Sequence, residues 1–338
     1  MSYAYFPGCK IPHHLPAYGQ AVTALCAALD IGLTPLEFNC CGEPLRHRSF
    51  EAWAQSAGRN LALAQQAGLA IMTPCKCCFG SLKHAAYWLR ENRELRSLVA
   101  STLAEEGLVL PEEPQVLHLL TVLDRDLQPD ELAARAGERL CGLRVAAHYG
   151  CHALRPGNVT NFDDPLNPSV FERLLRRVGA MPVPWALRLE CCGHPLRGKR
   201  DKLSLALKAR KLIDARDAGA HLLVTACTYC QMQFAQQDEN QTSPPLDTAI
   251  AQQVTAPEAR DTQAQGSPTV DANDDQPGAR PWPSAATQLA EDQPQGAMPP
   301  AMLAAQLIGL GIGLSPEELG LTELPAPLVH PSSLGHEG

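Results

Sequence analysis

The chain has 338 residues, 13 of them cysteine, and a formal net charge of −8 at pH 7. A chain of this length favours two domains, each large enough to bury its own core, so the cysteines are not needed as disulfide staples. Residues 237–300 carry ten acidic and two basic side chains, which accounts for the whole net charge. The rest of the chain lacks a basic stripe, which argues against a nucleic-acid partner.

The N-terminal segment Met-Ser-Tyr-Ala-Tyr-Phe-Pro-Gly has neither the basic nor the apolar region of a signal peptide. No apolar run reaches the length of a membrane span. We therefore expect a cytoplasmic protein. Thiols stay reduced in that compartment, so clustered cysteines favour metal or redox chemistry over a disulfide framework.

The first half of the chain alternates predicted strands with predicted helices. Strands are expected at residues 2–6, 34–38 and 69–73, and helices at 16–31, 50–67 and 79–90. This order predicts a parallel α/β sheet flanked by helices. A connecting helix is expected at 93–106. The apolar segment 115–124 fits a strand or a helix, and 131–140 is expected to be helical.

The second half repeats this order. Strands are expected at 143–148, 180–184 and 221–225, and helices at 168–179, 201–218 and from Cys227 onward. The similarity extends to sequence, because Ala67-Gly68 through Thr73 matches Ala218-Gly219 through Thr225. We infer a duplicated domain.

The fold class expected is therefore α/β, with two tandem duplicated domains, a disordered acidic insertion and a C-terminal helix. The insertion is rich in Gln, Pro and Asp and cannot bury enough apolar surface to fold. The segment 301–314 is mostly apolar and is expected to be helical, and Ser315 to Glu318 resembles a further helix start. The expected domains are a first domain, a second domain, the insertion, and a tail completing the second domain, at residues 1–140, 141–236, 237–299 and 300–338.

Ten of the cysteines form two sets of five in the same order: a Gly-Cys, an adjacent pair Cys-Cys-Gly, and a Cys-x-x-Cys. The first set is Cys9, Cys40, Cys41, Cys75 and Cys78, and the second set is Cys151, Cys191, Cys192, Cys227 and Cys230. Adjacent cysteines form only a strained disulfide, whereas thiolates bind soft metals well. In the first half, each group follows a predicted strand, where open α/β sheets place their sites.

Five thiols in each half exceed the four ligands of structural zinc, and the ferredoxin spacing is absent. Three cysteines fall outside the sets. Cys26 and Cys141 are interpreted as small buried hydrophobic residues. Cys77 lies inside the first Cys-x-x-Cys. A residue without a role in the site is the favoured interpretation, and an alternative ligand and a gating thiol are the other two.

Both halves resemble the cysteine-rich CCG domain, and the two copies with the Gln306-Leu-Ile-Gly-Leu310 tail resemble the B subunit of heterodisulfide reductase. The resemblance covers residues 1–236 and 300–322, and several spacings are slightly shorter than the family pattern, as a loop-length change would explain. In that family each set binds a noncubane 4Fe-4S cluster. The resemblance thus implies two such clusters, held by the first and second sets, and assigns catalysis to Cys9, Cys41, Cys151 and Cys192.

The function implied is the catalytic subunit of a heterodisulfide-reductase-like complex, which reduces or forms disulfide or sulfane-sulfur bonds between the two clusters. Composition rich in Ala, Arg and Gln favours a version from bacterial sulfur oxidation. No flavin or nicotinamide motif is present, so this chain is expected to bind neither cofactor and to exchange electrons through other subunits. The resemblance implies that these partners are a C-type iron–sulfur subunit and an A-type flavin subunit. Alternatives are a methanogen-type reductase of the coenzyme M–coenzyme B disulfide, a non-catalytic electron-transfer subunit of a dehydrogenase complex, and a zinc-stabilised interaction protein.

Five further residues are candidates for substrate contact. Arg46 and Arg197 end a Pro-Leu-Arg motif that follows both Cys-Cys-Gly groups, and arginine suits an anionic substrate group. Local salt bridges are the alternative role. His148, His152 and His194 lie beside the cysteine groups, where they could deliver protons to a thiolate or serve the structure alone.

Overall fold

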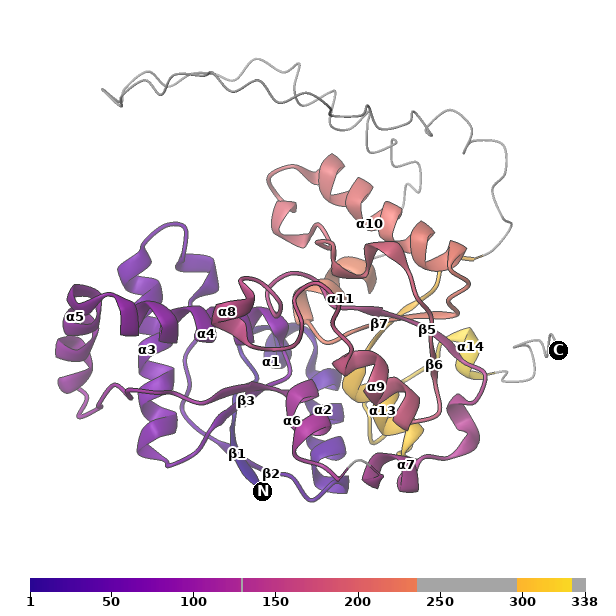
Figure 1. Ribbon diagram of the computed structural model, residues 1–338, viewed down its shortest axis with the longest axis horizontal. Coiled ribbons are helices and arrows are strands. Elements are labelled where there is room, and N and C mark those ends of the chain that lie inside the picture. The colour runs from indigo at the N-terminus through magenta and orange to yellow at the C-terminus, as the bar shows by residue number, and fades with distance from the viewer. Residues whose placement is uncertain (129, 236–296, 330–338) are drawn as a thin grey trace, which may run out of the picture.

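The computed structural model describes residues 1–128, 130–235 and 297–329, and it contains two four-stranded parallel sheets lying side by side (Figure 1). The first sheet has the order β2-β1-β3-β4. Its strands are β1 (Ser2–Tyr5), β2 (Gly32–Pro35), β3 (Ile71–Thr73) and β4 (Val116–His118). The helices of this half are α1 (Lys10–His14), α2 (Pro16–Ala28), α3 (Phe50–Gln66), α4 (Lys76–Glu91), α5 (Arg93–Ala104) and α6 (Leu119–Arg125).

The second sheet has the equivalent order β6-β5-β7-β8. Its strands are β5 (Arg144–His148), β6 (Met181–Pro182), β7 (Leu222–Thr225) and β8 (Ala301–Leu303). Its helices are α8 (Gly157–Thr160), α9 (Val170–Arg177), α10 (Asp201–Asp217), α11 (Thr228–Ala235), α13 (Ala304–Gly311) and α14 (Ala326–Val329). The α7 helix (Glu131–Arg135) lies between the two sheets in the chain. The expected α/β class with two duplicated sheets is confirmed, while the domain boundaries stay a prediction.

Each sheet has a fourth strand that the sequence does not clearly predict. In the first half the ambiguous segment 115–124 contains both a strand and a helix, β4 and then α6. In the second half the helix predicted from residue 301 is wrong over its first three residues, which form β8 and pair with β7, Leu223 opposite Ala301. Such pairing depends on a partner about eighty residues away in the chain, so local periodicity does not reveal it.

Several predicted boundaries move. The second strand lies at β2 rather than at 34–38, and α4 begins at Lys76, three residues earlier than predicted. The helix predicted over 131–140 ends at Arg135 and is followed by a 3₁₀ turn, Glu138–Leu140. Ser315 and Glu318 exchange the hydrogen bonds of a capping box, yet the segment is a turn. The disorder predicted for 237–299 concerns residues that lie almost wholly outside those described.

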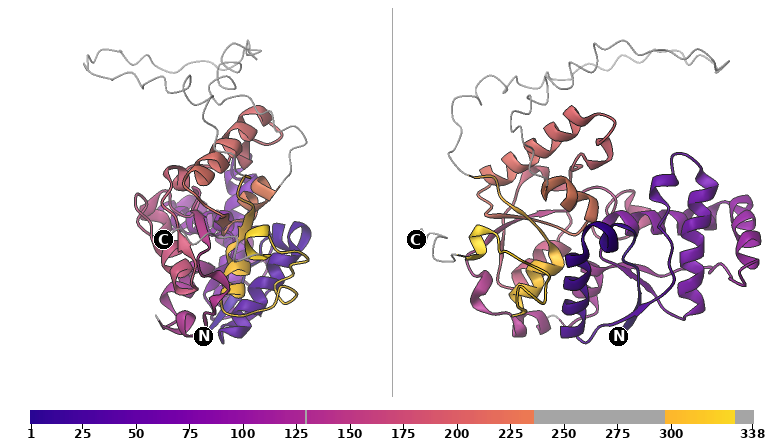
Figure 2. Two further views of the ribbon diagram at one scale, coloured as in Figure 1. Left: turned by 90° about the vertical axis from the view of Figure 1, so that its right-hand side faces the viewer. Right: turned by 180° about the vertical axis from the view of Figure 1, so that it is seen from behind.

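The two halves pack on each other in a reciprocal way. The helix α6 of the first half contacts α9 of the second, and α13 of the second contacts α2 of the first, as the rear view of Figure 2 shows for the latter pair. The chain after α13 also reaches α2, because a Cβ at Gly320 would lie 2.8 Å from Ala17. A Cβ at Gly309 or Gly311 would lie similarly close to Leu319 or Val178, so this glycine-rich stretch serves close packing. The C-terminal tail therefore completes the second sheet and joins it to the first half.

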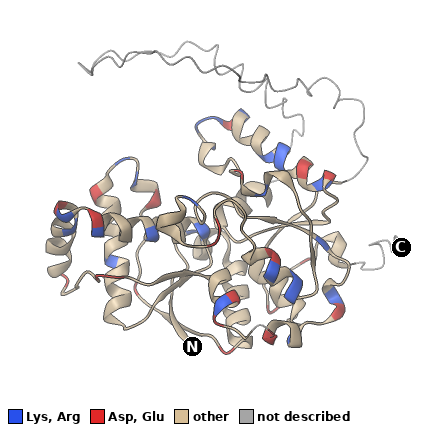
Figure 3. Cartoon of the chain, in the orientation of Figure 1, with Lys and Arg blue, Asp and Glu red and all other residues tan. Residues whose placement is uncertain are grey.

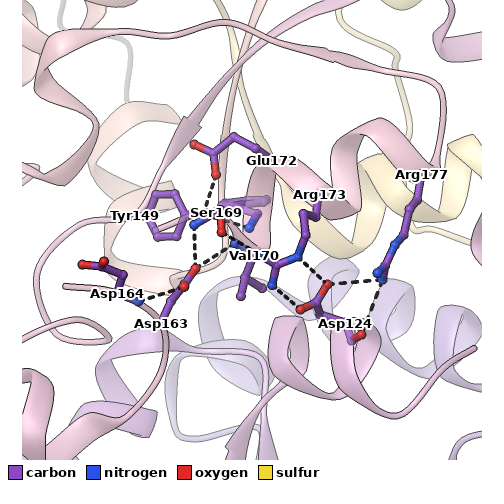
Figure 4. Close-up of polar contacts among 10 residues, drawn as sticks. Asp124, Tyr149, Asp163, Asp164, Ser169, Val170, Glu172, Arg173 and Arg177 are labelled. Carbon is purple, nitrogen blue, oxygen red and sulfur yellow. Dashed lines mark hydrogen bonds and ion pairs between the residues drawn. The ribbon is translucent and has the colours of Figure 1, made fainter. Parts of the chain in front are cut away.

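Ion pairs also connect α6 to α9 (Figure 4). The Asp124 carboxylate accepts hydrogen bonds from Arg173, with Nε at 3.2 Å, and lies 3.2 Å from Arg177 Nη1. Asp163 fixes the start of α9 by accepting the backbone N–H groups of Ser169 and Val170 at 2.7 Å each. Asp124 is thus a single carboxylate on which two arginines of the other half converge.

We expect Asp124→Ala to lower the free energy of unfolding by about 1–3 kcal/mol, because it leaves two half-buried guanidinium groups without their partner. Urea unfolding followed by circular dichroism measures this. Glu112→Ala is the matched control, since the Glu112 side chain is 88% exposed in its ion pair with Arg96 and should contribute little. Equal losses in the two variants would contradict the prediction.

Charged residues of both signs occur along α10 and α5 (Figure 3), so neither helix presents a surface of one sign. Within the part of the chain that the structure describes, no helix combines the length and the apolar character required to cross a bilayer.

Candidate metal centre

Each cysteine group follows a strand in the chain, and a 3₁₀ turn (Ala186–Leu189) lies between β6 and Cys191. In the first half the groups follow β1, β2 and β3, and in the second half β5, β6 and β7. Parallel strands end at the same edge of their sheet, so three groups distant in sequence meet in each half. The third group in each half also begins a helix: Cys75 precedes α4 and Cys227 precedes α11.

The five thiols of the first set contact one another in sequence. Cys40 Sγ lies 3.9 Å from Cys9 Sγ and also bonds to the Cys41 thiol. The Cys78 thiol donates hydrogen bonds to both Cys41 and Cys75. The first set is therefore a single cluster of sulfur atoms.

The second set repeats these contacts. Cys191 accepts hydrogen bonds from the Cys151 and Cys192 thiols, and the Cys230 thiol donates hydrogen bonds to Cys192 and Cys227. The structure thus brings together all five thiols that the sequence grouped in each half.

The two sets meet at the start of α4 and α11. The Cys75 thiol hydrogen-bonds to Cys227 of the other set, and its Sγ lies 3.2 Å from Thr228 Oγ1. The Lys76 backbone N–H donates to the Ala226 carbonyl at 3.1 Å across the same junction. The ten thiols form one continuous series of contacts, and the sets do not lie on opposite surfaces.

Hydrogen bonding stabilises three of the thiolates. The Cys41 and Cys9 thiols lower the pKa of Cys40, and the Cys151 and Cys192 thiols lower the pKa of Cys191. The Cys227 and Cys78 thiols lower the pKa of Cys75. The remaining thiols share a buried, weakly polar space in which several thiolates repel one another. A bound cation would relieve this repulsion, because metal binding deprotonates thiols and compensates their charge. The donor sets therefore suit a soft metal or a metal–sulfur group.

Two buried lysines lie beside the second set. Burial lowers the pKa of Lys76 to about 8, against the attraction of Cys230 and Cys227. Burial likewise lowers the pKa of Lys211 to about 8, opposed by Cys230 and Cys192. The sequence analysis identified neither lysine, because burial of a lysine in a helix cannot be recognised from local pattern.

A cavity of about 310 Å³ opens onto the second set and is lined by all five of its thiols. Glu43, His47 and Arg48 of the first half line it too, facing Lys199 of the second half. Its volume lies at the lower end of the range for small-molecule sites. Arg48 and Lys199 were missed by the sequence analysis, although a signal exists: each follows the repeated arginine of its half by two residues.

The predicted substrate residues occupy different places. His152 and His194 line the cavity, whereas Arg46 and Arg197 are not among its lining residues. Arg46 instead bonds to His84 Nδ1 at 3.1 Å, and Arg197 donates to a glutamine, Gln233, at 3.4 Å. His148 is fully buried beside the second set, with a ring nitrogen within 4.8 Å of Cys192 and Cys230 Sγ. Substrate binding by these five residues stays a prediction.

Contacts between the halves also form at the cavity. His152 Nε2 lies 3.4 Å from Glu43 Oε1, and this ion pair raises the pKa of His152. Burial is the largest single influence on Glu43 and raises its pKa, but the hydrogen bond and charge of His152, together with Arg46 and Ser81, outweigh it and lower the pKa. At the equivalent place in the duplication, His194 and Lys10 both contact the ring of Tyr229. In both cases the residue after a Gly-Cys, Lys10 or His152, lies near the residue that follows Cys-Cys-Gly in the other half, His194 or Glu43.

The three cysteines outside the sets lie in different environments. Cys26 is fully buried in α2, as predicted, and burial raises its pKa to about 12. The prediction of a buried Cys141 is wrong: this residue is exposed, because it follows the 3₁₀ turn at a surface bend before β5. Cys77 lines the cavity, and burial together with the Cys75 charge raises its pKa.

The position before Cys9 has no room for a side chain, because the Cys78 thiol lies against it. Gly8 has a φ of +67°, and a Cβ there would lie 2.6 Å from Cys78 Sγ. We expect Gly8→Ala to displace Cys78 and to lower the metal content of the purified protein by about half. Gly68→Ala is the matched control, because its φ is +66° with nothing within 4 Å of the added Cβ. It should cost about 1 kcal/mol of stability and leave the metal content unchanged; equal metal loss in both variants would refute the steric argument.

Comparison with known proteins places these features in a family. The cysteine-rich domain model named CCG matches residues 3–83 and 145–235, which include every cysteine of both sets. The chain is 31% identical over 234 residues to the B subunit of the ferredoxin/F420H2-dependent CoB-CoM heterodisulfide reductase of Methanosarcina acetivorans, covering 68% of this chain and 78% of that one. It is 32% identical over 240 residues to the 8-methylmenaquinol:fumarate reductase membrane anchor subunit of Wolinella succinogenes, covering 69% and 81%.

A crystal structure of a hypothetical protein from Helicobacter pylori has the same fold, with a TM-score of 0.62 and 13% identity. The match covers 94% of this chain and 50% of that one. The family match and the relatives at about 31% identity agree with the duplicated cysteine sets. The chain therefore belongs to the tandem CCG-domain family that includes the B subunit of heterodisulfide reductase.

Proposed function

We propose that this chain is the catalytic iron–sulfur subunit of a heterodisulfide-reductase-like complex, acting on disulfide or sulfane-sulfur bonds in bacterial sulfur oxidation. The observation that carries the proposal is the continuous contact of ten thiols beside a cavity of about 310 Å³. A protein that merely relayed electrons would need the thiols but not a space of substrate size. The family membership adds relatives named as heterodisulfide reductase subunits.

The first and second sets each hold one noncubane 4Fe-4S cluster in this proposal. Five sulfur ligands per set exceed what tetrahedral zinc takes, and the thiols already touch one another. When bound, the two clusters supply the two electrons and the sulfur-binding metal sites that cleavage of a disulfide requires. The Cys75–Cys227 contact joins the two sets of residues that would hold them.

The remaining residues of the cavity bind and orient the substrate. Arg48 and Lys199 place positive charge at the cavity and favour an anionic thiol, disulfide or sulfane compound. His152 bridges the halves: its Nδ1 lies 3.4 Å from Cys151 Sγ and its Nε2 lies 3.4 Å from Glu43. A proton held on this imidazole is placed to reach a sulfur atom leaving the substrate beside Cys151.

We place the protein in the cytoplasm, with a C-type iron–sulfur subunit and an A-type flavin subunit as its partners. The relatives are named as subunits of reductases, which implies assembly with other chains. The domain limits at residues 140, 236 and 299 remain part of this proposal.

The test is anaerobic purification followed by iron and sulfide analysis and turnover assays. We expect about eight iron and a matching amount of labile sulfide per chain, with turnover on an anionic sulfane-sulfur or persulfide compound using an artificial electron acceptor. Zinc in place of iron would overturn the cluster assignment. Turnover confined to the coenzyme M–coenzyme B disulfide would overturn the assignment to sulfur oxidation.

A second candidate is a non-catalytic electron-transfer subunit. The relative from Wolinella succinogenes favours it, since its name describes the membrane anchor of a reductase. Under this alternative the chain would contain iron and exchange electrons with a partner, and no small sulfur compound would perturb the spectra of its clusters.

A further inference from the structure

The two cysteine sets have the same geometry but differ in the side chains that surround them. Because the halves are duplicated, each position near the first set has an equivalent near the second, counted from the same cysteine. Three of these equivalent pairs are fully buried around the sulfur atoms: Asn60 and Lys211, Thr228 and Lys76, Phe6 and His148.

The first pair supports the Cys-Cys loops. Asn60 and Lys211 each lie nineteen residues after the Cys-Cys pair of their half, on α3 and α10. The neutral Asn60 amide donates to the Cys40 carbonyl at 3.2 Å. The Lys211 ammonium donates to the carbonyl of Glu190, directly before Cys191, at 3.1 Å. The same structural task is performed by a neutral group in one half and by a cation in the other.

The second pair crosses between the halves. Thr228 follows the first cysteine of its Cys-x-x-Cys and contacts the first set through Cys75. Lys76 occupies the equivalent position and reaches the second half, where its ammonium donates to the His148 carbonyl at 3.1 Å. Glu172 lies close enough to attract Lys76, but its carboxylate is also paired with Arg188 at 2.9 Å. The Lys76 charge is therefore not cancelled by a carboxylate of its own.

The third pair lies three residues before Cys9 and Cys151. The Phe6 ring lies beside Gly8, where a Cβ added to the glycine would be 3.6 Å from the ring. The His148 ring lies beside Gly150 in the same way, where an added Cβ would be 3.3 Å from Nε2. Both His148 ring nitrogens are buried without a hydrogen-bond partner among the described residues, and one lies within 4.8 Å of Cys192 and Cys230 Sγ. An imidazole carries at least one N–H in either charge state, so it can donate to a sulfur atom where Phe6 cannot.

We propose that the second set holds the centre with the higher reduction potential, because Lys76, Lys211 and His148 stabilise added negative charge there. Reduction makes a metal–sulfur centre more negative, and nearby cations and hydrogen bonds to sulfur favour the reduced form. Lys10 beside Cys9 does not remove this difference, because it is a single cation, whereas two buried lysines, Lys76 and Lys211, lie beside the second set. The inference rests on the proposed cluster binding, and it places the first added electron beside the substrate cavity.

The experiment is a redox titration of the anaerobically reconstituted full chain, monitored by EPR. In the wild type we expect two separable potentials. His148→Phe installs the first-half residue and should lower the potential of one centre, leaving the other potential and the iron content unchanged. His148→Gln keeps an N–H donor and should restore most of that shift.

Lys211→Met provides an independent variant, and the exposed Lys202→Met on the same helix is its control. Lys211→Met should lower the same potential as His148→Phe, and Lys202→Met should move neither. Two wild-type centres with one shared potential, or a His148→Phe titration identical to the wild type, would overturn the inference while leaving the cluster assignment intact. Loss of iron in His148→Gln but not in Lys211→Met would also overturn the inference, because it would identify His148 as a ligand of the metal. A chain without iron would overturn the proposed function itself.

Discussion

Cys41→Ser and Cys192→Ser should each remove about half of the bound iron and lower turnover by at least about a hundredfold. Each cysteine belongs to a different set and is nearly buried, with 4% of its surface exposed. Serine is a poor ligand for iron–sulfur centres, so the set that loses its thiol should lose its cluster. Turnover should fall in both variants because a disulfide needs two electrons, and the proposed mechanism takes them from two clusters.

Cys26→Ser and Cys141→Ser are the matched controls. Cys26 is buried in α2 and Cys141 is exposed, and neither contacts a set by any interaction described above. Both should retain full iron content, measured by chelation colorimetry under anaerobic conditions, and wild-type turnover. If Cys41→Ser lost half of the iron and kept its turnover, the first cluster would be a dispensable relay and the two-cluster mechanism would be wrong.

The duplicated architecture and the composition of the thiol sets could be predicted from the sequence, because both depend on patterns among residues close together in the chain. Buried strands before each Gly-Cys and Cys-x-x-Cys, and helices ending at glycine, are short-range signals. The repeated spacing of five cysteines then implied that each set converges, and the structure places their sulfur atoms in contact.

Features that depend on contacts between the halves could not be predicted. The segment from Ala301 to Leu303 has an apolar pattern suited to a helix, and it becomes a strand only because β7 offers a free edge. The ion pair of Glu43 with His152 joins residues more than a hundred positions apart. Exposure of Cys141 follows from its place at a surface bend, which its apolar neighbours do not indicate.

The choice of arginine is the clearest example within the site. The sequence singled out Arg46 and Arg197 because they repeat within a motif, yet their described contacts are with protein side chains, His84 and Gln233. Arg48 and Lys199, two residues further on, face the cavity. A 3₁₀ turn follows each Cys-Cys-Gly group, and the cation that lines the cavity lies beyond the end of that turn. The spacing of the motif does not reveal the path of the chain there.

Charge reversal at these two positions should therefore impair substrate binding strongly. We expect Arg48→Glu and Lys199→Glu each to raise KM for an anionic sulfur substrate by about ten- to a hundredfold, with a much smaller change in kcat. Each substitution replaces an attraction at the cavity by a repulsion, while the thiol sets remain as they are. The loss should be larger at low ionic strength, because salt screens the interaction.

Steady-state kinetics with anionic and neutral substrates of similar size distinguishes this effect from damage to the fold. The neutral compound should show nearly the same KM in the variants and the wild type, and iron content should be unchanged. Arg90→Glu is the matched control, because it reverses an exposed charge on α4 in an ion pair with Glu91. Equal increases in KM for both substrates would mean that Arg48 and Lys199 shape the cavity without recognising charge, and the substrate would then not be selected as an anion.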